Sequence, residues 1–331
     1  MSSQEKRSDL SCSYIRNDST SCPNEADESG LCYWHNPKAD KANAFLKEEL
    51  EKYLQTSTNL EGFQLANADL HGIKLMIHGK KEGVNLSHAD LYRADLSHAH
   101  LFHINLSHSS LMKANLSESN LNLANLESSN MLGTIFSHTK IEHVHWGKSI
   151  IQEREAFKQH KAGNMEESAD FFEQGEEVYR NLRKLSESRG HFEHAGYFFH
   201  KEMVMRRYQM KTFSFERMIS KLVDLFCGYG EKPINVIFFS LSVIFISAIL
   251  FFFVGIQNAG EFAVFSTNNS LMMNLMHFFN ALYFSVVTFT TLGYGDISPL
   301  GFSRLIAASE AFVGSFTLAL FVVVFVKKMT R

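Results

Sequence analysis

The chain has 331 residues, of which 45% are hydrophobic and 13% aromatic, and its net charge at pH 7 is −3. This composition fits a membrane protein of several parts, in which polar and apolar regions average out over the whole chain. The polar N-terminus shows no cleavable signal pattern. No nucleophile–base set, phosphate-binding loop or acid pair stands out, so the sequence does not predict an enzyme.

Residues 1–40 hold three of the four cysteines, Cys12, Cys22 and Cys32, followed closely by His35. Three thiolates and one imidazole make a closed tetrahedral set for zinc, which predicts a structural metal site with these four residues as ligands. The set resembles small Cys3His zinc knuckles, although its spacing differs from that of the common finger. Three unrelated thiols are the alternative, and the acidic residues of this stretch argue against nucleic-acid binding.

A five-residue repeat runs through the next part of the chain. Leu occupies every fifth position from Leu86 to Leu126, a small residue usually precedes it by two positions, and Asn or Asp often directly precedes it. An earlier run from Leu60 to Leu75 has the same spacing, and an insertion near residues 79–83 shifts the register by one. Period five matches neither a helix nor a strand. It fits a square coil of four five-residue faces, with Leu and the small residue inside.

This pattern resembles the pentapeptide-repeat family, whose fold is a right-handed quadrilateral β-helix. The resemblance implies a rigid scaffold of roughly four stacked coils over residues 59–146. Trp146 lies at the closing end of the repeat, where we expect it to cap the coil.

Histidine is abundant on the predicted coil. Because twenty residues would make one coil, we expect His88 and His108 to stack on one face, with His98 on the opposite face. A column of stacked histidines could sense pH or bind metal. The plainer interpretation is a set of solvated polar positions at the corners of the coil. The histidines of this region are His88, His98, His100, His103, His108, His138, His143 and His145.

The block that follows is predicted to be helical. Apolar residues recur three to four positions apart from Phe171 to Leu185, and the pattern resumes from Phe192 to Met203 after Gly190. The block resembles one helical hairpin of tetratricopeptide type. A single hairpin cannot bury its own apolar face, so we expect it to pack on the repeat coil or on a neighbouring subunit.

Two apolar runs near the end of the chain are long enough to cross a membrane, residues 234–256 and about 305–326. Pro233 suits the first turn of the earlier helix. Between the runs, residues 276–290 are apolar but too short to span, and this predicts a re-entrant helix. No Arg-rich voltage-sensing helix is present, and no regulatory domain is expected after the second run.

The basic residues predict an orientation for these helices. Lys and Arg lie before the first run and after the second, whereas residues 257–300 contain neither. The positive-inside rule then places both termini in the cytoplasm, in a multi-pass protein of the cell membrane. The basic stretch over residues 206–232 is expected to run along the inner leaflet.

A T-L-G-Y-G-D loop follows the predicted re-entrant helix. Four copies of this loop can surround a dehydrated potassium ion with rings of backbone carbonyls and with the Thr291 hydroxyls. Carbonyls that all point inward need left-handed backbone angles at alternate residues, and Gly293 and Gly295 adopt these cheaply. Tyr294 is expected to brace the loop from behind, and Asp296 to draw cations to the outer mouth.

Residues 233–331 resemble the two-helix pore module of potassium channels, with Leu292 where Val is commoner. A second G-Y-G at residues 228–230 lacks the preceding Thr and is read as a turn. The resemblance implies a homotetramer with an α-helical pore that conducts K+. Glu310 could be a structural acid behind the filter or a gating element, and Gly314 a hinge or a packing contact.

Together these features predict a potassium-selective channel whose cytoplasmic part acts as a sensor or scaffold, with an unidentified cytoplasmic ligand or protein as partner. A membrane-anchored interaction scaffold with a non-conducting or weakly selective pore is the alternative. The predicted parts are a zinc-knuckle-like segment (1–40), a helical linker (41–58), the repeat coil (59–146), a helical hairpin with a linker (147–232) and the pore module (233–331).

Overall fold

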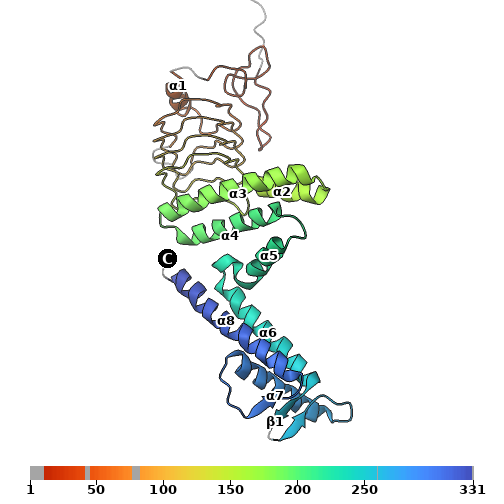
Figure 1. The fold of residues 1–331 in the computed structure, drawn as a ribbon. Helices are drawn as coiled ribbons and strands as arrows, with labels where there is room; N and C mark the ends of the chain where they lie inside the picture. Colours follow the sequence, from red (N-terminus) through yellow and green to blue (C-terminus); the bar gives the residue numbers. More distant parts are fainter. Residues whose placement is uncertain (1–10, 42–44, 77–82, 259, 330–331) are drawn as a thin grey trace, which may run out of the picture. The chain divides into compact units, whose positions relative to one another are not determined.

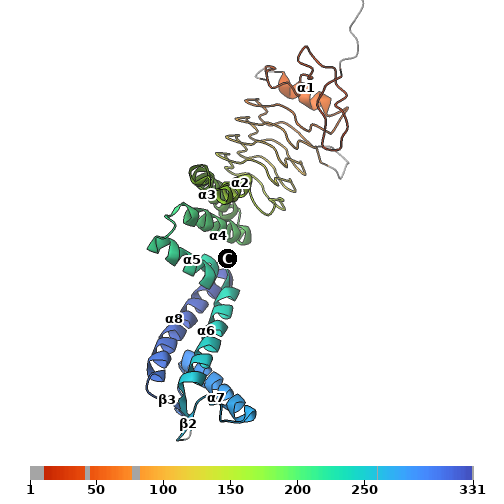
Figure 2. The same cartoon turned by 90° about the vertical axis from the view of Figure 1, so that its right-hand side faces the viewer.

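The computed structural model describes residues 11–41, 45–76, 83–258 and 260–329. The chain divides into two compact units, Met1–Lys211 and Thr212–Arg331. The division falls earlier than residue 233, where the sequence pattern placed the start of the pore module. Each unit is described by itself below, with elements labelled as in Figures 1 and 2.

The first unit begins with a small irregular segment. Antiparallel bridges pair Ser11 with Glu25 and Ile15 with Ser21, which makes a short hairpin. The predicted linker contains one helix, α1 (Leu46–Tyr53), whose Leu46 and Leu50 are fully buried. These two leucines recur at i and i+4, so they lie on one face of the helix and join the core beside the repeat.

The repeat forms stacked coils. Parallel bridges join each Asn or Asp position to the equivalent position 20 residues later, as from Asn85 to Asn105 and from Asn105 to Asn125. Across the insertion the offset is 26, from Asn59 to Asn85, which is one repeat and one residue more than a regular coil. The predicted register shift is therefore confirmed, although residues 77–82 of the insertion lie outside the described residues.

Each corner of the coil uses the same local chemistry. The Oδ1 atom of the Asn or Asp accepts a hydrogen bond from the backbone N–H two residues later, as between Asn105 and Ser107 at 3.1 Å. The residue two positions after each Leu has a positive φ, for example +58° at His108. His tolerates this left-handed region better than most residues. Residues of other types, such as Arg93 and Lys113, share this turn position, so it favours His without requiring it. The histidines at this position are His88, His98, His103, His108, His138 and His143.

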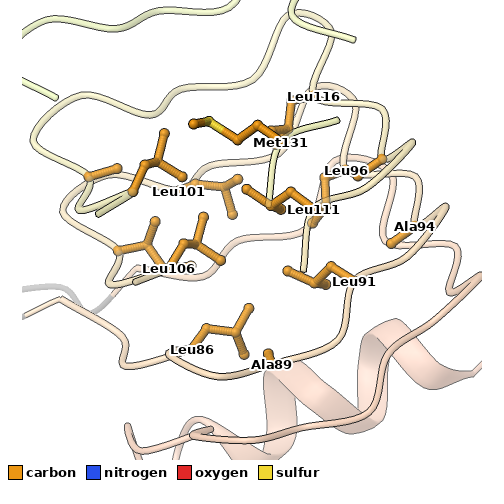
Figure 3. Close-up of a cluster of buried hydrophobic side chains, with 14 of the residues drawn as sticks. Leu86, Ala89, Leu91, Ala94, Leu96, Leu101, Leu106, Leu111, Leu116 and Met131 are labelled. Carbon is orange, nitrogen blue, oxygen red and sulfur yellow. The ribbon is translucent and has the colours of Figure 1, made fainter. Parts of the chain in front are cut away.

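The interior of the coil is filled by the Leu positions. Leu91 and Leu111 are fully buried, and Met131 continues their column in the next coil (Figure 3). The small residues complete the core, and Ser hydroxyls among them donate to backbone carbonyls, as from Ser109 to Leu106 at 2.6 Å. Other apolar side chains occupy the Leu position towards the end of the repeat, namely Met131, Phe136, Ile141 and Trp146.

Three helices follow the last coil: α2 (Ile151–Ala162), α3 (Met165–Ser188) and α4 (Phe192–Gln209). The helix α3 packs on both α2 and α4. The predicted hairpin corresponds to α3 and α4, and α2 is a third helix packed beside it. Gly190 makes the turn of the hairpin with φ +75°. Of the two expected partners, the coil or a neighbouring subunit, the structure shows the helices packed on the coil.

Two contacts hold these helices to the end of the repeat. The ring of Trp146 meets Phe198 edge to face at 5.7 Å. The Nε of Arg189 donates to the carbonyl of Thr139 at 2.7 Å. Trp146 thus closes the coil against the helices, as the sequence predicted, and the aromatic contact excludes water from the end of the apolar core.

The second unit is helical, with α5 (Phe215–Cys227), α6 (Pro233–Val254), α7 (Leu271–Phe289) and α8 (Ser303–Met329). The second G-Y-G, residues 228–230, is a tight turn between α5 and α6, as predicted. Among the described residues, α6, α7 and α8 are long and apolar enough to cross a membrane. The prediction that the middle helix is too short to span is therefore wrong by length, because α7 starts five residues before the predicted start.

A small sheet connects the ends of these helices, and the sequence pattern did not predict it. Its strands β1 (Ile256–Asn258), β2 (Glu261–Ala263) and β3 (Ile297–Pro299) are antiparallel in the order β2-β1-β3. Ile256 faces Pro299 across β1 and β3. The end of α6 therefore lies beside the start of α8.

Candidate functional site

The T-L-G-Y-G-D loop follows α7 directly, and its first residues are hydrogen-bonded to the last turn of that helix. The backbone N–H of Thr291 donates to Thr288 at 3.0 Å, and that of Leu292 donates to Val287 at 3.0 Å. The Thr290 hydroxyl also donates to the Val286 carbonyl at 2.7 Å. These bonds use carbonyls that a helix end otherwise leaves unpaired, and they fix the start of the loop to α7.

The backbone of the loop alternates. Thr291, Gly293 and Gly295 have φ values of +58°, +57° and +79°. The two glycines occupy the left-handed region, as predicted from the sequence. Thr291 shares this conformation and was not predicted to do so, because its β-branched side chain makes a positive φ unfavourable.

The whole loop is exposed in the single chain. Leu292 is 59% exposed and Tyr294 is 67% exposed. A Cβ atom added to Gly293 or Gly295 would meet nothing within 4 Å. Tyr294 is thus not enclosed within the single chain, and its bracing role stays a prediction.

Both ends of the segment that contains α7 meet at one place. The β1–β3 pairing joins residues directly after α6 to residues directly before α8. The Ser303 hydroxyl also donates to the Gly255 carbonyl at 2.5 Å. Because the two ends of this segment lie side by side, the segment would enter and leave a membrane on the same side. These contacts therefore support a re-entrant α7, although its length alone does not.

Glu310 and Gly314 both face α7 from α8. Glu310 is 3% exposed, and its Oε1 lies 2.5 Å from the Ser285 hydroxyl. A Cβ atom on Gly314 would lie 2.0 Å from the carbonyl oxygen of Phe289. Of the two roles considered for Gly314, this close approach supports a packing contact, and a hinge role stays a prediction.

The other predicted site is in the first unit. The ligand atoms of Cys12, Cys22, Cys32 and His35 all lie within 4.8 Å of one another, and all four residues are buried. The Cys22 and Cys32 sulfurs are 3.9 Å apart, and His35 Nδ1 lies 3.5 Å from Cys12 Sγ and 3.2 Å from Cys32 Sγ. A tetrahedral zinc with ordinary bond lengths needs separations of roughly 3.8 Å between sulfurs and roughly 3.5 Å between sulfur and nitrogen.

The surroundings of this set fit a metal ligand sphere. His35 presents Nδ1 to the sulfurs, and its Nε2 lies 2.9 Å from the Glu61 carbonyl, which fixes the ring in the orientation that metal-ligating histidines adopt. The ring of Tyr14 stacks on His35 at 4.0 Å. Burial raises the pKa of the Cys22 thiol to about 12 in the absence of a cation. The four residues could therefore hold a metal ion, and a cation there would stabilise the thiolate.

The stacking predicted for His88 and His108 is confirmed. The rings of His88 and His108 are stacked at 4.9 Å with 4° between their planes. His98 lies elsewhere, 3.3 Å from a carboxylate oxygen of Glu118. The Asn17 side chain reaches His88 Nε2 at 2.5 Å. His88 and His108 are exposed corner residues, which supports the plainer interpretation of solvated positions.

Comparisons with known proteins match two stretches of the chain. Residues 239–331 match the ion channel family, and residues 82–107 and 109–145 match pentapeptide repeats in 8 copies. Neither of these is an enzyme family. A comparison with curated proteins found no match.

Similar solved structures are pentapeptide repeat proteins. One is Rfr23 from the cyanobacterium Cyanothece 51142, which is 27% identical with a TM-score of 0.19, over 28% of this chain and 58% of that one. Another is HetL from Nostoc sp. strain PCC 7120, a pentapeptide repeat protein involved in heterocyst differentiation regulation, which is 25% identical with a TM-score of 0.16, over 28% of this chain and 52% of that one. The chain thus spans little more than half of either structure. With three helices able to cross a membrane, it is a membrane protein that carries an ion channel domain and pentapeptide repeats.

Proposed function

We propose that the protein is a homotetrameric potassium-selective channel. The observation that carries the proposal is the alternation of positive φ at Thr291, Gly293 and Gly295, in an exposed loop at the end of an apolar helix. Alternation of this kind turns successive carbonyls towards one side of the backbone, and rings of carbonyls from four chains can replace the hydration shell of K+. The channel family match at residues 239–331 supports the same function.

The proposed tetramer would supply the carbonyls and the apolar contacts that a single chain lacks. One loop supplies a quarter of each carbonyl ring, so conduction requires a closed symmetric assembly. Large apolar side chains of α8, such as Phe312 at 75% and Phe316 at 64%, are exposed in the single chain. In the proposed assembly they contact lipid or neighbouring chains, α6 and α8 span the membrane, and α7 is the re-entrant pore helix.

The proposed orientation places both termini in the cytoplasm of a cell membrane. Among residues 255–304, Arg304 is the one Lys or Arg, and its Nε donates to the Pro299 carbonyl at 3.4 Å. At the opposite end of α8, Lys327 pairs with Glu231 at 2.6 Å. The excess of positive charge lies at the latter end, where the positive-inside rule expects the cytoplasm.

In this proposal the stacked coils are a right-handed quadrilateral β-helix that serves the pore as a rigid scaffold or sensor. The continuous parallel bridges and the fully buried Leu columns favour rigidity. An opening signal would then be passed through the helices that follow the coil, with a cytoplasmic ligand or protein as its source. The proposed parts keep the boundaries given by the sequence: 1–40, 41–58, 59–146, 147–232 and 233–331.

Potassium flux into liposomes that hold the purified full-length protein tests the proposal. Wild type should take up K+ in preference to Na+, and Gly293→Ala should reduce K+ uptake to the rate of protein-free liposomes, because a Cβ opposes the left-handed backbone. Gly260→Ala is the matched control, since Gly260 also has positive φ (+89°) and open space around it but lies outside the filter. An intact tetramer without flux would instead favour a membrane-anchored interaction scaffold.

We further propose that Cys12, Cys22, Cys32 and His35 hold a structural Zn2+ ion. The separations between the ligand atoms fit tetrahedral bonding, and the three sulfur ligands favour a soft cation such as zinc. When bound, zinc would fix the N-terminal segment in place by joining residues that are distant in sequence. His35 extends this link to the first coil through the Glu61 carbonyl.

Metal analysis of the purified protein tests this site. Wild type should contain one zinc per chain, and Cys22→Ser should lower the content severalfold. Cys227→Ser is the control, because Cys227 is also buried but lies in the second unit. Equal zinc contents in the two variants would remove the assignment.

A further inference from the structure

Glu310 is enclosed by the helices of its own chain. It is 3% exposed in α8, and its Oε1 lies 2.5 Å from the hydroxyl of Ser285 in α7, which is itself fully buried. The Ser285 hydroxyl also lies 2.8 Å from the carbonyl oxygen of Ile244 in α6. Because this cluster is already covered within one chain, neighbouring subunits cannot add partners to it.

Counting hydrogens shows which form of the carboxyl fits these distances. Ser285 has one hydroxyl hydrogen, but its oxygen lies within bonding distance of two acceptors if Glu310 is ionised. One of these contacts would then place two oxygens at short distance without a hydrogen between them. If Glu310 carries a proton, it donates to Ser285, and Ser285 donates to Ile244, so that every short contact contains a hydrogen.

The surrounding charges point the same way. Glu310 Oε2 is buried and has no hydrogen-bond partner among the residues that the structure describes. The helix α6 contains no ionisable side chain, α7 contains only His277 and Tyr283, and α8 contributes Arg304 near its start and Lys327 and Lys328 at its far end. The hydroxyl of Ser247 in α6 is the other polar group that acts on the carboxyl, and among the described residues no cation contacts it. An ionised carboxylate that only two hydroxyls face is costly inside a membrane helix.

A second contact repeats this connection one helical turn further on. Ser285 and Phe289 are four residues apart on α7, as are Glu310 and Gly314 on α8. Gly314 allows α8 to approach the Phe289 carbonyl, which lies directly before the loop. The two contacts together hold the C-terminal turn of α7 against α8, so the acid sets the position from which the loop starts.

We propose that Glu310 is a protonated positioning residue, whose carboxyl hydrogen closes a chain from α8 through Ser285 to Ile244 and fixes the helix that carries the loop. The effect on conduction rests on the proposed channel function, whereas the protonated state of the carboxyl does not. This role needs no bound ligand. Of the two roles considered for Glu310, a structural acid behind the loop and a gating element, it favours the structural acid.

Infrared spectroscopy of the full-length protein at neutral pH tests the protonated state. The carbonyl band of a neutral carboxylic acid should be present in wild type and disappear in Glu310→Gln. Glu231→Gln is the matched control, because Glu231 is paired with Lys327 and should contribute a carboxylate instead. Identical acid bands in wild type and Glu310→Gln would overturn the proposal, whether or not the protein conducts.

Variants then test the positioning role. Glu310→Gln keeps a donor towards Ser285 and should retain the wild-type tetramer and flux within about twofold, whereas Glu310→Ala and Ser285→Ala should each reduce the tetramer fraction or flux by about tenfold, the factor expected when a buried hydrogen bond is lost. If Glu310→Gln were as impaired as Glu310→Ala, the charge and not the donated hydrogen would be required, and the proposal would be wrong.

Discussion

The repeat coil and the pore unit differ in how much of each is completed within one chain. In the coil, bridges 20 residues apart pair the backbone and the Leu columns are fully buried. In the pore unit, the loop at residues 291–296 is exposed, as are large side chains such as Phe312. A coil that satisfies its own backbone and core needs no partner, whereas the pore unit gains its missing contacts from lipid and, in the proposed tetramer, from other chains.

The largest expected effect falls on the unit that depends on neighbours. Gly314→Ala should disrupt the tetramer and abolish K+ flux, because the added Cβ would lie 2.0 Å from the Phe289 carbonyl and force α8 away from α7. Ser315→Ala, on the exposed side of α8, is the control. Size-exclusion chromatography with light scattering and liposome flux measure the two results. A normal tetramer in Gly314→Ala would show that this packing is dispensable.

The coil should respond to a core substitution without involving the pore. Leu111→Ala leaves a cavity in a fully buried column and should reduce the free energy of unfolding by about 2–5 kcal/mol. Urea unfolding of the full-length protein can be followed by tryptophan fluorescence, because Trp34 and Trp146 both belong to the first unit. Leu123→Ala, at a corner that is 43% exposed, should change much less. If Leu111→Ala also lost K+ flux, the pore unit would depend on the stability of the coil.

A smaller effect is expected from the ladder of Asn side chains along the coil. Asn105 donates from Nδ2 to Asn85 Oδ1 at 3.1 Å and accepts at Oδ1 from the Ser107 N–H at 3.1 Å. Asn105→Ala should destabilise the first unit by about 1–2 kcal/mol, because both bonds are lost. Asn105→Asp keeps the acceptor and should recover part of this loss in the same unfolding measurement. Equal losses in the two variants would show that the turn acceptor contributes nothing.

The smallest effect is expected at the histidine corners. Replacing His88 and His108 together by Asn should change the free energy of unfolding by less than about 0.5 kcal/mol, because Asn also tolerates positive φ at an exposed position. Flux measured between about pH 5 and 7.5, where histidine titrates, should have the same profile in wild type and variant. A pH response that disappears in the variant would favour a sensing column instead.

The coil was predictable because one local rule recurs in every repeat. The Leu spacing, the Asn or Asp before each Leu and the offset at the insertion all follow from residues close in sequence, and the bridges agree with them. The glycine conformations in the loop were predictable for the same reason. The start of α7 was missed although Ser270 gives a helix-start signal, its hydroxyl accepting from the Met273 N–H at 3.2 Å.

Contacts between distant residues could not be read from the sequence. The strands β1 and β3 have three residues each and pair across the whole of α7, so no periodic pattern announces them. The four metal ligands were predicted from residue type. No sequence spacing indicates that the Glu61 carbonyl orients His35 or that the Tyr14 ring stacks on His35. The partners of Glu310 on two other helices depend in the same way on tertiary packing.

The pairing of β1 with β3 has a consequence for engineering. Because Asn258 lies opposite Ile297, the intervening segment is a loop closed at its base by its own hydrogen bonds. Such a segment can be exchanged as one cassette while α6 and α8 keep their ends together. Loops from other channels, with their own preceding helices, could be grafted between these two residues to alter ion preference on an unchanged frame.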